Sequence, residues 1–323
     1  MTLHKEVFVL AIERLKIAQR ILVTTHIHPD GDSIGSLLGI GLALIDAGKE
    51  VQMVLDDGIP SDLRFLQDCD KILNRPDGSF DLILIVDCSD LERVGKALAG
   101  LQKPDINIDH HATNMNFARI NLVDTCASAT TEIIRVIIEE LRIPLSQPIA
   151  NALMTGLITD TIGFRTNNVT PRTLRMASEL LETGINLSDL YHRTLIRRSF
   201  ESAHLWGFGL KNLERNGRLI WTTLSLKDRE TAGYPGRDDA DLINFLTVID
   251  GVDIALVFLE QKDGSVKVSW RAQPEYDVSR LALRFGGGGH PAAAGAEIQG
   301  SLPYVQTSVL NLTLSLLEGG YDV

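Results

Sequence analysis

Short apolar runs alternate with longer amphipathic segments along the first half of the chain. These runs occupy residues 21–25, 51–55, 82–86 and 106–108, and we expect each to form a strand. Residues 82–86 are apolar throughout and too few for a helix, which is typical of a parallel strand covered on both faces. Helices are expected over residues 33–47, 130–141, 147–159 and 173–182, and an amphipathic helix over residues 1–20. Strands that alternate with helices predict an α/β fold with a doubly wound, mainly parallel sheet.

The second half of the chain predicts a separate set of strands and helices. Strands are expected over residues 219–224, 254–260 and 265–271, with Asp263 and Gly264 as a hairpin signal, and helices over residues 239–249 and 278–284. A chain of 323 residues is longer than a domain with a single hydrophobic core usually is. We therefore expect a first domain over residues 1–186, a helical connector over 187–207 and a second domain over 208–323.

Composition and charge narrow the class of protein. Hydrophobic residues make up 44% of the chain and charged residues 23%, as in an ordinary soluble globular protein. The formal net charge of -11 argues against binding of long duplex nucleic acid, although bound metal ions would still admit a small anionic substrate. Cys69, Cys88 and Cys126 show no disulfide or metal spacing, so a cytoplasmic location is expected. The start of the chain does not resemble a secretory signal, and no run reaches the ~20 apolar residues of a membrane span.

Polar side chains stand where the predicted strands of the first domain end. His26 follows the first strand, Asp87 follows residues 82–86, and Asp109 follows residues 106–108. The carboxyl ends of parallel strands share one edge of a sheet, where ligand crevices form. Asp87 would be partly desolvated there, and a bridging position between two metal ions would satisfy its charge.

Two further motifs add carboxylates and imidazoles. The loop from His26 to Asp32 brings Asp30 and Asp32 close together, and such charges need a cation, although a solvated turn is the competing interpretation. In Asp109-His110-His111, one imidazole can bind metal while its neighbour faces a phosphate and Asp109 orients a ring. Asp160 ends a predicted helix, where it could equally serve as a helix-terminal cap. Together these groups suit two divalent metal ions and the hydrolysis of phosphate esters.

Candidate substrate contacts lie elsewhere in the chain. Arg165, followed by Thr166, Asn167 and Asn168, offers a planar donor fork and amides that suit phosphate and a nucleotide. The stretch from Gly286 to His290 lacks the Lys of a P-loop, and its exposed N–H groups predict an anion cradle more than an irregular loop. The residues of this cradle are Gly287, Gly288, Gly289 and His290. Arg271 is either a second phosphate ligand or a solvated side chain.

The ordered set of motifs resembles the DHH phosphoesterase family with its associated C-terminal domain, over nearly the whole chain. Within that family the chain is most similar to the bifunctional oligoribonuclease (nanoRNase) and pAp phosphatase group. The resemblance implies an N-terminal α/β domain and a smaller C-terminal α/β domain that face each other across an active-site cleft. It also implies one metal ion on His26, Asp30 and Asp87, a second on Asp32, Asp87, His110 and Asp160, His111 beside the transferring phosphoryl group, and Arg271 with residues 286–290 on the substrate.

Two positions depart from the family pattern. The chain has Thr159-Asp160-Thr161-Ile162-Gly163 where the family often has Thr-Asp-Thr-Gly, which puts local substrate contacts in doubt. Ser33 stands where Ala is frequent, and we expect this change to matter little.

The expected activity is hydrolysis of short oligoribonucleotides to mononucleotides and of adenosine 3',5'-bisphosphate (pAp) to AMP. Manganese suits the ligand set well, with zinc, cobalt and iron as alternatives. Other activities remain open, namely hydrolysis of cyclic or linear dinucleotides, single-strand exonuclease action, and a noncatalytic nucleotide-binding role. We expect short single-stranded RNA and pAp-type nucleotides as partners, no long duplex and no membrane. A homodimer is left open.

Overall fold

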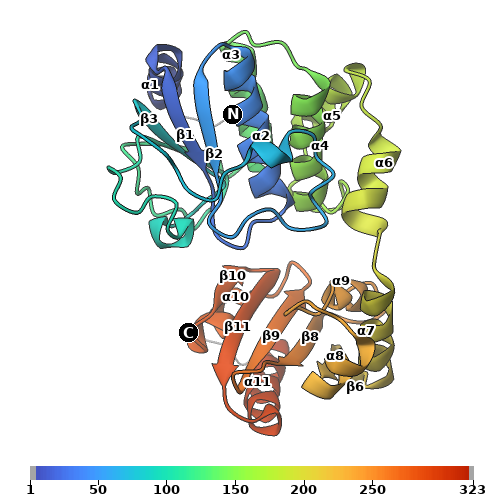
Figure 1. The fold of residues 1–323 in the computed structure, drawn as a ribbon. Coiled ribbons are helices and arrows are strands. Elements are labelled where there is room, and N and C mark those ends of the chain that lie inside the picture. Colours follow the sequence, from blue (N-terminus) through green and yellow to red (C-terminus); the bar gives the residue numbers. More distant parts are fainter. Residues whose placement is uncertain (1–4, 320–323) are drawn as a thin grey trace. The chain divides into compact units, whose positions relative to one another are not determined.

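The computed structural model describes residues 5–319 and divides into two compact units, Met1–Arg197 and Arg198–Val323 (Figure 1). The expected α/β fold is confirmed. The expected helix over residues 1–20 is observed from Lys5, and residues 1–4 lie outside the described part of the chain. Within the described residues no helix is long and apolar enough to cross a membrane.

The first unit carries a five-stranded sheet and its helices. Its strands are β1 (Arg20–Thr24), β2 (Glu50–Val54), β3 (Leu82–Val86), β4 (Ile106–Asp109) and β5 (Ile120–Val123). Its α-helices are α1 (Lys5–Ile17), α2 (Gly31–Asp46), α3 (Thr130–Glu140), α4 (Gln147–Asp160), α5 (Pro171–Glu182) and α6 (Leu187–Tyr191). Short 3-10 turns occupy Cys69–Lys71 and Leu91–Val94, and one π-helical turn occupies His192–Ile196.

The strand order of this sheet is β2-β1-β3-β4-β5, with every neighbouring pair parallel. The chain moves from β1 outward to β2 and then returns to place β3 on the other side of β1. Such a reversal of direction creates a crevice at the carboxyl ends of the two central strands. The loops after β1 and β3 therefore lie at the position where an α/β sheet of this kind binds its ligand.

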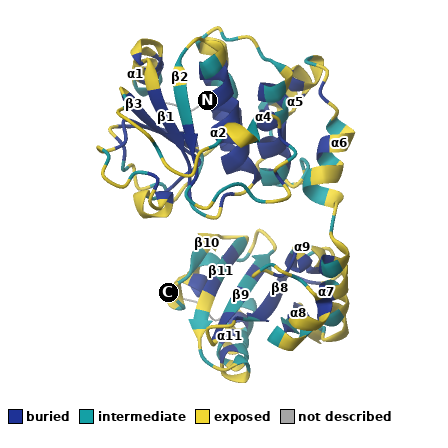
Figure 2. Cartoon of the chain, in the orientation of Figure 1, coloured by how far each residue is buried: buried dark blue, intermediate teal, exposed yellow. Residues whose placement is uncertain are grey.

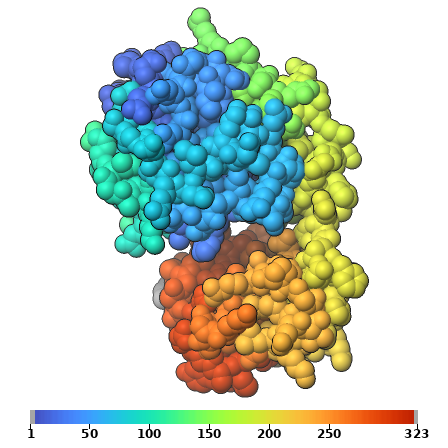
Figure 3. Space-filling model, viewed as in Figure 1, coloured from blue at the N-terminus to red at the C-terminus, as the bar shows by residue number. Residues whose placement is uncertain are grey.

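Both faces of the sheet are covered, as the apolar run 82–86 predicts. All five residues of β3 are buried (Figure 2). Leu82, Leu84 and Val86 belong to the core that includes α2, α3 and α4, whereas Ile83 and Ile85 pack in a smaller cluster under residues 88–101. The segment between β2 and β3, residues 55–81, covers the front of the unit in the space-filling view, where it is light blue (Figure 3).

Helices α2 and α4 approach each other closely through glycines. A Cβ on Gly35 would lie 2.5 Å from the carbonyl oxygen of Ala152, and one on Gly31 would lie 2.3 Å from Oγ1 of Thr159. No side chain fits at either place without displacing a helix. This contact sets the first turn of α2 against the last turn of α4, which ends at Asp160.

The second unit has a six-stranded mixed sheet in the order β10-β11-β9-β8-β7-β6. Its strands are β6 (Glu214–Asn216), β7 (Leu219–Leu224), β8 (Ile254–Glu260), β9 (Ser265–Ala272), β10 (Gly288–His290) and β11 (Ala293–Gln299). Its helices are α7 (Phe200–Lys211), α8 (Leu226–Ala232), α9 (Leu242–Leu246), α10 (Ser279–Arg284) and α11 (Leu302–Leu317). The helices cover both faces, since α10 and α11 contribute to one apolar core and α7, α8 and α9 to the other.

The expected hairpin at Gly264 is observed between β8 and β9, but one other expectation in this unit needs correction. The helix expected over residues 239–249 is shorter, because Ala240 and Asp241 take left-handed backbone conformations and α9 begins only at Leu242. The glycine stretch is not a loop throughout. Residues 288–290 form the edge strand β10, paired antiparallel with β11.

Candidate metal centre

The cluster of polar residues forms at the carboxyl edge of the first sheet, where the strand ends meet. His26 follows β1, Asp87 follows β3, and Asp109 is the last residue of β4, directly before His110 and His111. Asp30 is the N-cap residue of α2 and Asp32 lies in its first turn, while Asp160 ends α4. Four separate stretches of sequence therefore deliver side chains to one place, namely residues 26–32, 87, 109–111 and 160.

Three overlapping groups of side chains bring their potential ligand atoms within 4.8 Å of one another. The first group is His26, Asp30 and Asp87, and the second is Asp32, His110 and Asp160. The third group joins them, because it contains Asp87 and His110 together with His111. Seven side chains thus form one connected cluster, which we call the ligand cluster: His26, Asp30, Asp32, Asp87, His110, His111 and Asp160.

The backbone and local hydrogen bonds fix the orientation of several of these side chains. Asp30 and Ser33 form a reciprocal capping box, in which the Ser33 amide donates to Asp30 Oδ1 at 3.0 Å and Ser33 Oγ accepts from the Asp30 amide at 2.8 Å. The Ser33 backbone amide, which an alanine would also supply, orients the Asp30 carboxylate, and the Ser33 hydroxyl adds a bond to the Asp30 backbone amide. Asp87 lies in the left-handed region with φ 52°, which turns the chain sharply at the end of β3.

Two imidazoles are oriented by hydrogen bonds at Nδ1. The His26 Nδ1–H donates to the carbonyl oxygen of Ile27 at 2.8 Å, which leaves Nε2 as the lone-pair nitrogen, 3.7 Å from Asp87 Oδ2. His111 Nδ1 lies 2.7 Å from Asp109 Oδ1. Asp109 is fully buried and also accepts from Asn114 Nδ2 at 2.5 Å, so its oxygens are engaged in holding the motif. These contacts agree with an orienting role for Asp109.

The ligand cluster concentrates negative charge in a buried place. Burial together with the charges of Asp87 and Asp160 raises the pKa of Asp32 well above its usual value. Burial also raises the pKa of Asp160 to about 7, with His110 opposing and Asp87 adding to the shift. Burial would lower the pKa of His110, but the carboxylates of Asp160, Asp32 and Asp87 raise it to about 9. Such mutual repulsion among carboxylates is relieved by cations.

Asp87 behaves differently from its acidic neighbours. Burial alone would raise the pKa of its carboxyl group, but the neighbouring His26 imidazole and the charges of His110 and His111 hold that pKa below its usual range. Asp87 therefore stays ionised although it is 1% exposed. An ionised carboxylate shared by two ligand groups is the geometry that a bridging ligand requires.

The donor set fits two divalent metal ions. Each of the first two groups combines imidazole nitrogen with carboxylate oxygen, which suits Mn²⁺ and the other divalent transition metals. The carboxylate oxygens also face imidazole nitrogens at distances of 3.4 to 3.9 Å, as for His110 Nε2 with Asp160 Oδ2 and with Asp87 Oδ1. These separations are too long for strong direct hydrogen bonds. A metal ion bound between a carboxylate oxygen and an imidazole nitrogen would accept a lone pair from each.

Other residues singled out in the sequence lie outside the ligand cluster. His28, which lies within the loop from His26 to Asp32, is exposed and faces Asp57, with Nδ1 3.4 Å from Oδ2. Arg165 is exposed in the turn after α4. Arg271, Gly287, Gly288, Gly289 and His290 belong to the second unit.

The glycines at the start of β10 have a packing role of their own. A Cβ on Gly287 would lie 2.1 Å from the carbonyl oxygen of Gly295, and Gly289 has φ 139°. Gly288 has open space where a Cβ would stand. Two of the four glycines are thus required by the β10–β11 pairing, independently of any ligand.

Two residues near the ligand cluster were not predicted from the sequence. Thr130 donates from Oγ1 to Asp87 Oδ1 at 2.9 Å, and Asn114 bonds Asp109. Thr130 is 43 positions from Asp87, so no local spacing could have indicated the contact. Only the folded sheet brings these residues together.

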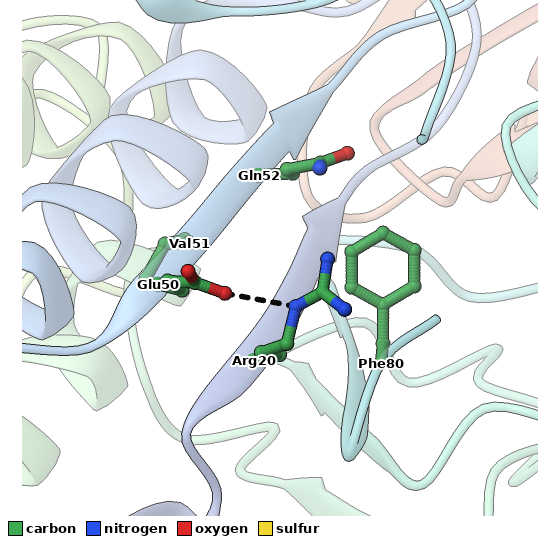
Figure 4. A pocket seen from close by; sticks show the side chains of 5 residues that line it. All are labelled: Arg20, Glu50, Val51, Gln52 and Phe80. Carbon is green, nitrogen blue, oxygen red and sulfur yellow. Dashed lines mark ion pairs between the residues drawn. The ribbon is translucent and has the colours of Figure 1, made fainter. Parts of the chain in front are cut away.

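A separate hollow lies at the opposite ends of the strands. It is lined by Arg20, Glu50, Val51, Gln52 and Phe80, with an ion pair of 2.8 Å between Arg20 Nε and Glu50 Oε2 (Figure 4). Arg20 and Glu50 are the first residues of β1 and β2, whereas the ligand cluster follows the last residues of β1 and β3. The hollow is therefore distinct from the candidate metal centre.

The fold and the ligand cluster together define an α/β protein with a candidate metal centre at the switch point of a parallel sheet. The chain belongs to the DHH family of phosphoesterases. The model of the DHH family N-terminal domain matches residues 20–157, and that of the DHHA1 domain matches residues 231–313.

Several known proteins are similar over most of their length. The chain is 35% identical over 285 residues to the bifunctional oligoribonuclease and PAP phosphatase NrnA of Thermus thermophilus, covering 87% of this chain and 84% of the relative. It is 27% identical over 292 residues to the NrnA of Bacillus subtilis, covering 89% and 92%. The crystal structure of an exopolyphosphatase-related protein from Bacteroides fragilis has a TM-score of 0.88 at 25% identity, covering 97% of both chains.

Proposed function

We propose that the protein is a metal-dependent phosphoesterase that hydrolyses short oligoribonucleotides to mononucleotides and pAp to AMP. The observation that carries the proposal is the ligand cluster, in which His26, Asp30 and Asp87 adjoin Asp32, His110 and Asp160. The relatives named for both activities, which match more than four fifths of the chain, support the choice of substrates.

We assign to the ligand cluster two divalent ions, preferably manganese, which would supply positive charge to the phosphoryl oxygens and lower the pKa of water. The side chains hold this charge in place, with Asp87 between the two groups. His111 is held at Nδ1 by Asp109, and we place its imidazole beside the transferring phosphoryl group. The rigid parallel sheet contributes mainly position, as phosphoryl transfer requires.

We propose that Arg271 binds a substrate phosphate, together with Gly287, Gly288, Gly289 and His290 of the second unit. Arg165 of the first unit is a separate proposed substrate contact. Arg271 is half-buried and already oriented, because Nε donates to Asn244 Oδ1 at 3.2 Å and one terminal nitrogen donates to the carbonyl oxygen of Trp270 at 2.9 Å. The other terminal nitrogen would be the donor for a phosphate. As β10 is an edge strand, one side of its backbone has no partner strand in the sheet.

The proposed setting is a reducing cytoplasm, because the spacing of Cys69, Cys88 and Cys126 in the sequence does not resemble a disulfide framework. Short RNA fragments and pAp need only a few local contacts, which suits the net charge of -11. Assembly as a homodimer is kept as a hypothesis that light scattering would test.

A single assay separates this function from its alternatives. The substrates are diadenylate RNA, pAp, cyclic di-AMP and a long single-stranded oligomer, each incubated with manganese. We expect turnover of the first two to exceed that of the others. Preferential cleavage of cyclic di-AMP or of the long strand would replace the proposed substrates, and tight binding of a nucleotide that is recovered intact would indicate a noncatalytic role.

A further inference from the structure

We propose that Thr130, with the first turn of α3, is the positioning element that fixes the two ligand groups relative to each other. The inference rests on the proposed function, since it concerns how the ligand cluster holds its ions. Thr130 Oγ1 donates to Asp87 Oδ1 at 2.9 Å, and the Thr130 backbone amide donates to Asp32 Oδ2 at 2.6 Å. Thr130 therefore bonds one carboxylate from each group.

The start of α3 explains why these bonds form. Its N-cap residue is Ala129, which has no side-chain acceptor for the free amides of the first turn. Asp32, 98 positions earlier, supplies the acceptor instead, because Oδ2 accepts from Thr130 and Oδ1 accepts from the Thr131 amide at 3.2 Å. Asp32 thus satisfies the amides at the start of α3, and these amides satisfy the buried carboxylate of Asp32.

The geometry leaves the carboxylates able to bind metal. A carboxylate oxygen that accepts one N–H or O–H bond retains a further lone pair. Asp32 and Asp87 are 2% and 1% exposed, so their rotation is restricted by packing as well as by these bonds. Loss of the Thr130 hydroxyl would free Asp87 Oδ1 while Asp32 stayed bound to the backbone. The separation between the two groups would then lose its constraint.

Hydrogen bonds of Glu132 hold the first turn of α3 in place. Glu132 Oε2 accepts from the Ser128 amide at 2.9 Å and from Ser128 Oγ at 2.6 Å, which fixes the chain entering the helix. Arg172 of α5 bonds Glu132 through Nε and Asp124 through a terminal nitrogen at 3.2 Å. The position of Thr130 is therefore set by two helices.

The test compares Thr130→Val, which removes the hydroxyl, with Thr130→Ser, which keeps it. Thr155→Val is the matched control, because Thr155 is a buried threonine of the same unit whose hydroxyl has no hydrogen-bond partner in the structure. Titration calorimetry measures manganese affinity, and electron paramagnetic resonance reports magnetic coupling between two bound ions. Thr130→Val should weaken manganese binding about 10- to 100-fold, abolish the coupling signal, and lower kcat with little change in KM. Thr130→Ser and Thr155→Val should behave as the wild type.

The possible failures are distinguishable. If wild-type protein binds no manganese, the proposed function itself is wrong. If wild type binds two coupled ions and Thr130→Val binds them with the same affinity and coupling, only the positioning role is overturned. Thermal unfolding without metal checks folding, and Thr130→Ala carries the same test if the valine variant does not fold.

Discussion

Asp87 combines a buried charge with a left-handed backbone. The conformation at φ 52° is uncommon for a residue with a side chain, and aspartate tolerates it better than most. The same residue faces His26, His110 and His111. Among single residues, this carboxylate therefore carries the greatest share of the proposed metal chemistry.

Asp87→Asn should remove manganese binding and turnover together. The amide preserves the volume and can still accept from Thr130, but it loses the charge that the ions require. We expect manganese affinity and kcat each to fall by at least ~100-fold, measured by calorimetry and by hydrolysis of diadenylate. Asp90→Asn is the control, because Asp90 caps the turn at Leu91–Val94 and asparagine also caps well. Retained activity with both ions bound would refute the bridging role.

Asp239 in the second unit gives a prediction about pH. Burial, with the charges of Asp241 and Asp238, raises the pKa of Asp239 from 3.8 to about 6. The folded state therefore holds this proton more tightly than the unfolded state. Its contribution to stability is present below about pH 4 and is lost as pH rises through about 6.

Asp239→Asn should remove this loss of stability. The difference between the two pKa values corresponds to about 3 kcal/mol. The variant should therefore gain up to that free energy of unfolding above pH 7, and its stability should depend less on pH. Urea unfolding between pH 4 and pH 8 measures it, with exposed Asp250→Asn as the control. A variant with the same slope as wild type between about pH 4 and 6 would contradict the burial argument.

At the scale of elements, the packing of α2 on α4 determines whether Asp32 and Asp160 meet. Gly156 lies at this contact, where a Cβ would stand 2.7 Å from Asp32 Oδ1 and 2.5 Å from Thr131 Cγ2. The absence of a side chain at Gly156 on α4 thus makes room for Asp32, the proposed metal ligand on α2.

Gly156→Ala should destabilise the protein by about 1–3 kcal/mol and weaken manganese binding, because the added methyl group displaces Asp32. Gly207→Ala, in α7, is the matched control, since no atom lies within 4 Å of the place that its methyl group would take and the change should stabilise the helix by about 0.5–1 kcal/mol. Chemical denaturation and calorimetry report the two effects. Equal stability and affinity for Gly156→Ala and wild type would show that the interface adjusts freely.

The sequence predicted several elements whose own residues favour them. It missed the short strand β5 (Ile120–Val123) and elements that depend on tertiary contacts. The strand at residues 82–86 was predicted to the residue because its apolar run is unambiguous. Strand β11 was missed, since alanine and glycine rarely favour strands and only its pairing with β9 reveals it. The shortening of α9 depends on the left-handed backbone conformations of Ala240 and Asp241, which the pattern of hydrophobic residues does not predict.

At the scale of the whole molecule, residues from distant parts of the sequence must act together. The residues of the ligand cluster were predictable because each follows a strand or lies at a helix end at the same sheet edge. Thr130 and Asn114 were not, because their contacts with Asp87 and Asp109 exist only in the folded chain. The second unit adds the proposed substrate contacts.

Arg271→Ala and His290→Ala should raise KM for a dinucleotide while leaving manganese affinity unchanged. Loss of one charged hydrogen bond to phosphate predicts an increase of about 10-fold or more for Arg271→Ala. Arg280→Ala, an exposed arginine of the same unit, is the control. Unchanged dinucleotide kinetics in both variants would remove these residues from the substrate site.

An anomalous diffraction map from crystals of the wild-type protein grown with manganese would locate the ions themselves. We expect two peaks in the first unit, one among His26, Asp30 and Asp87 and the other among Asp32, His110 and Asp160. A map without peaks at these groups, or with manganese bound only elsewhere, would refute the dinuclear centre.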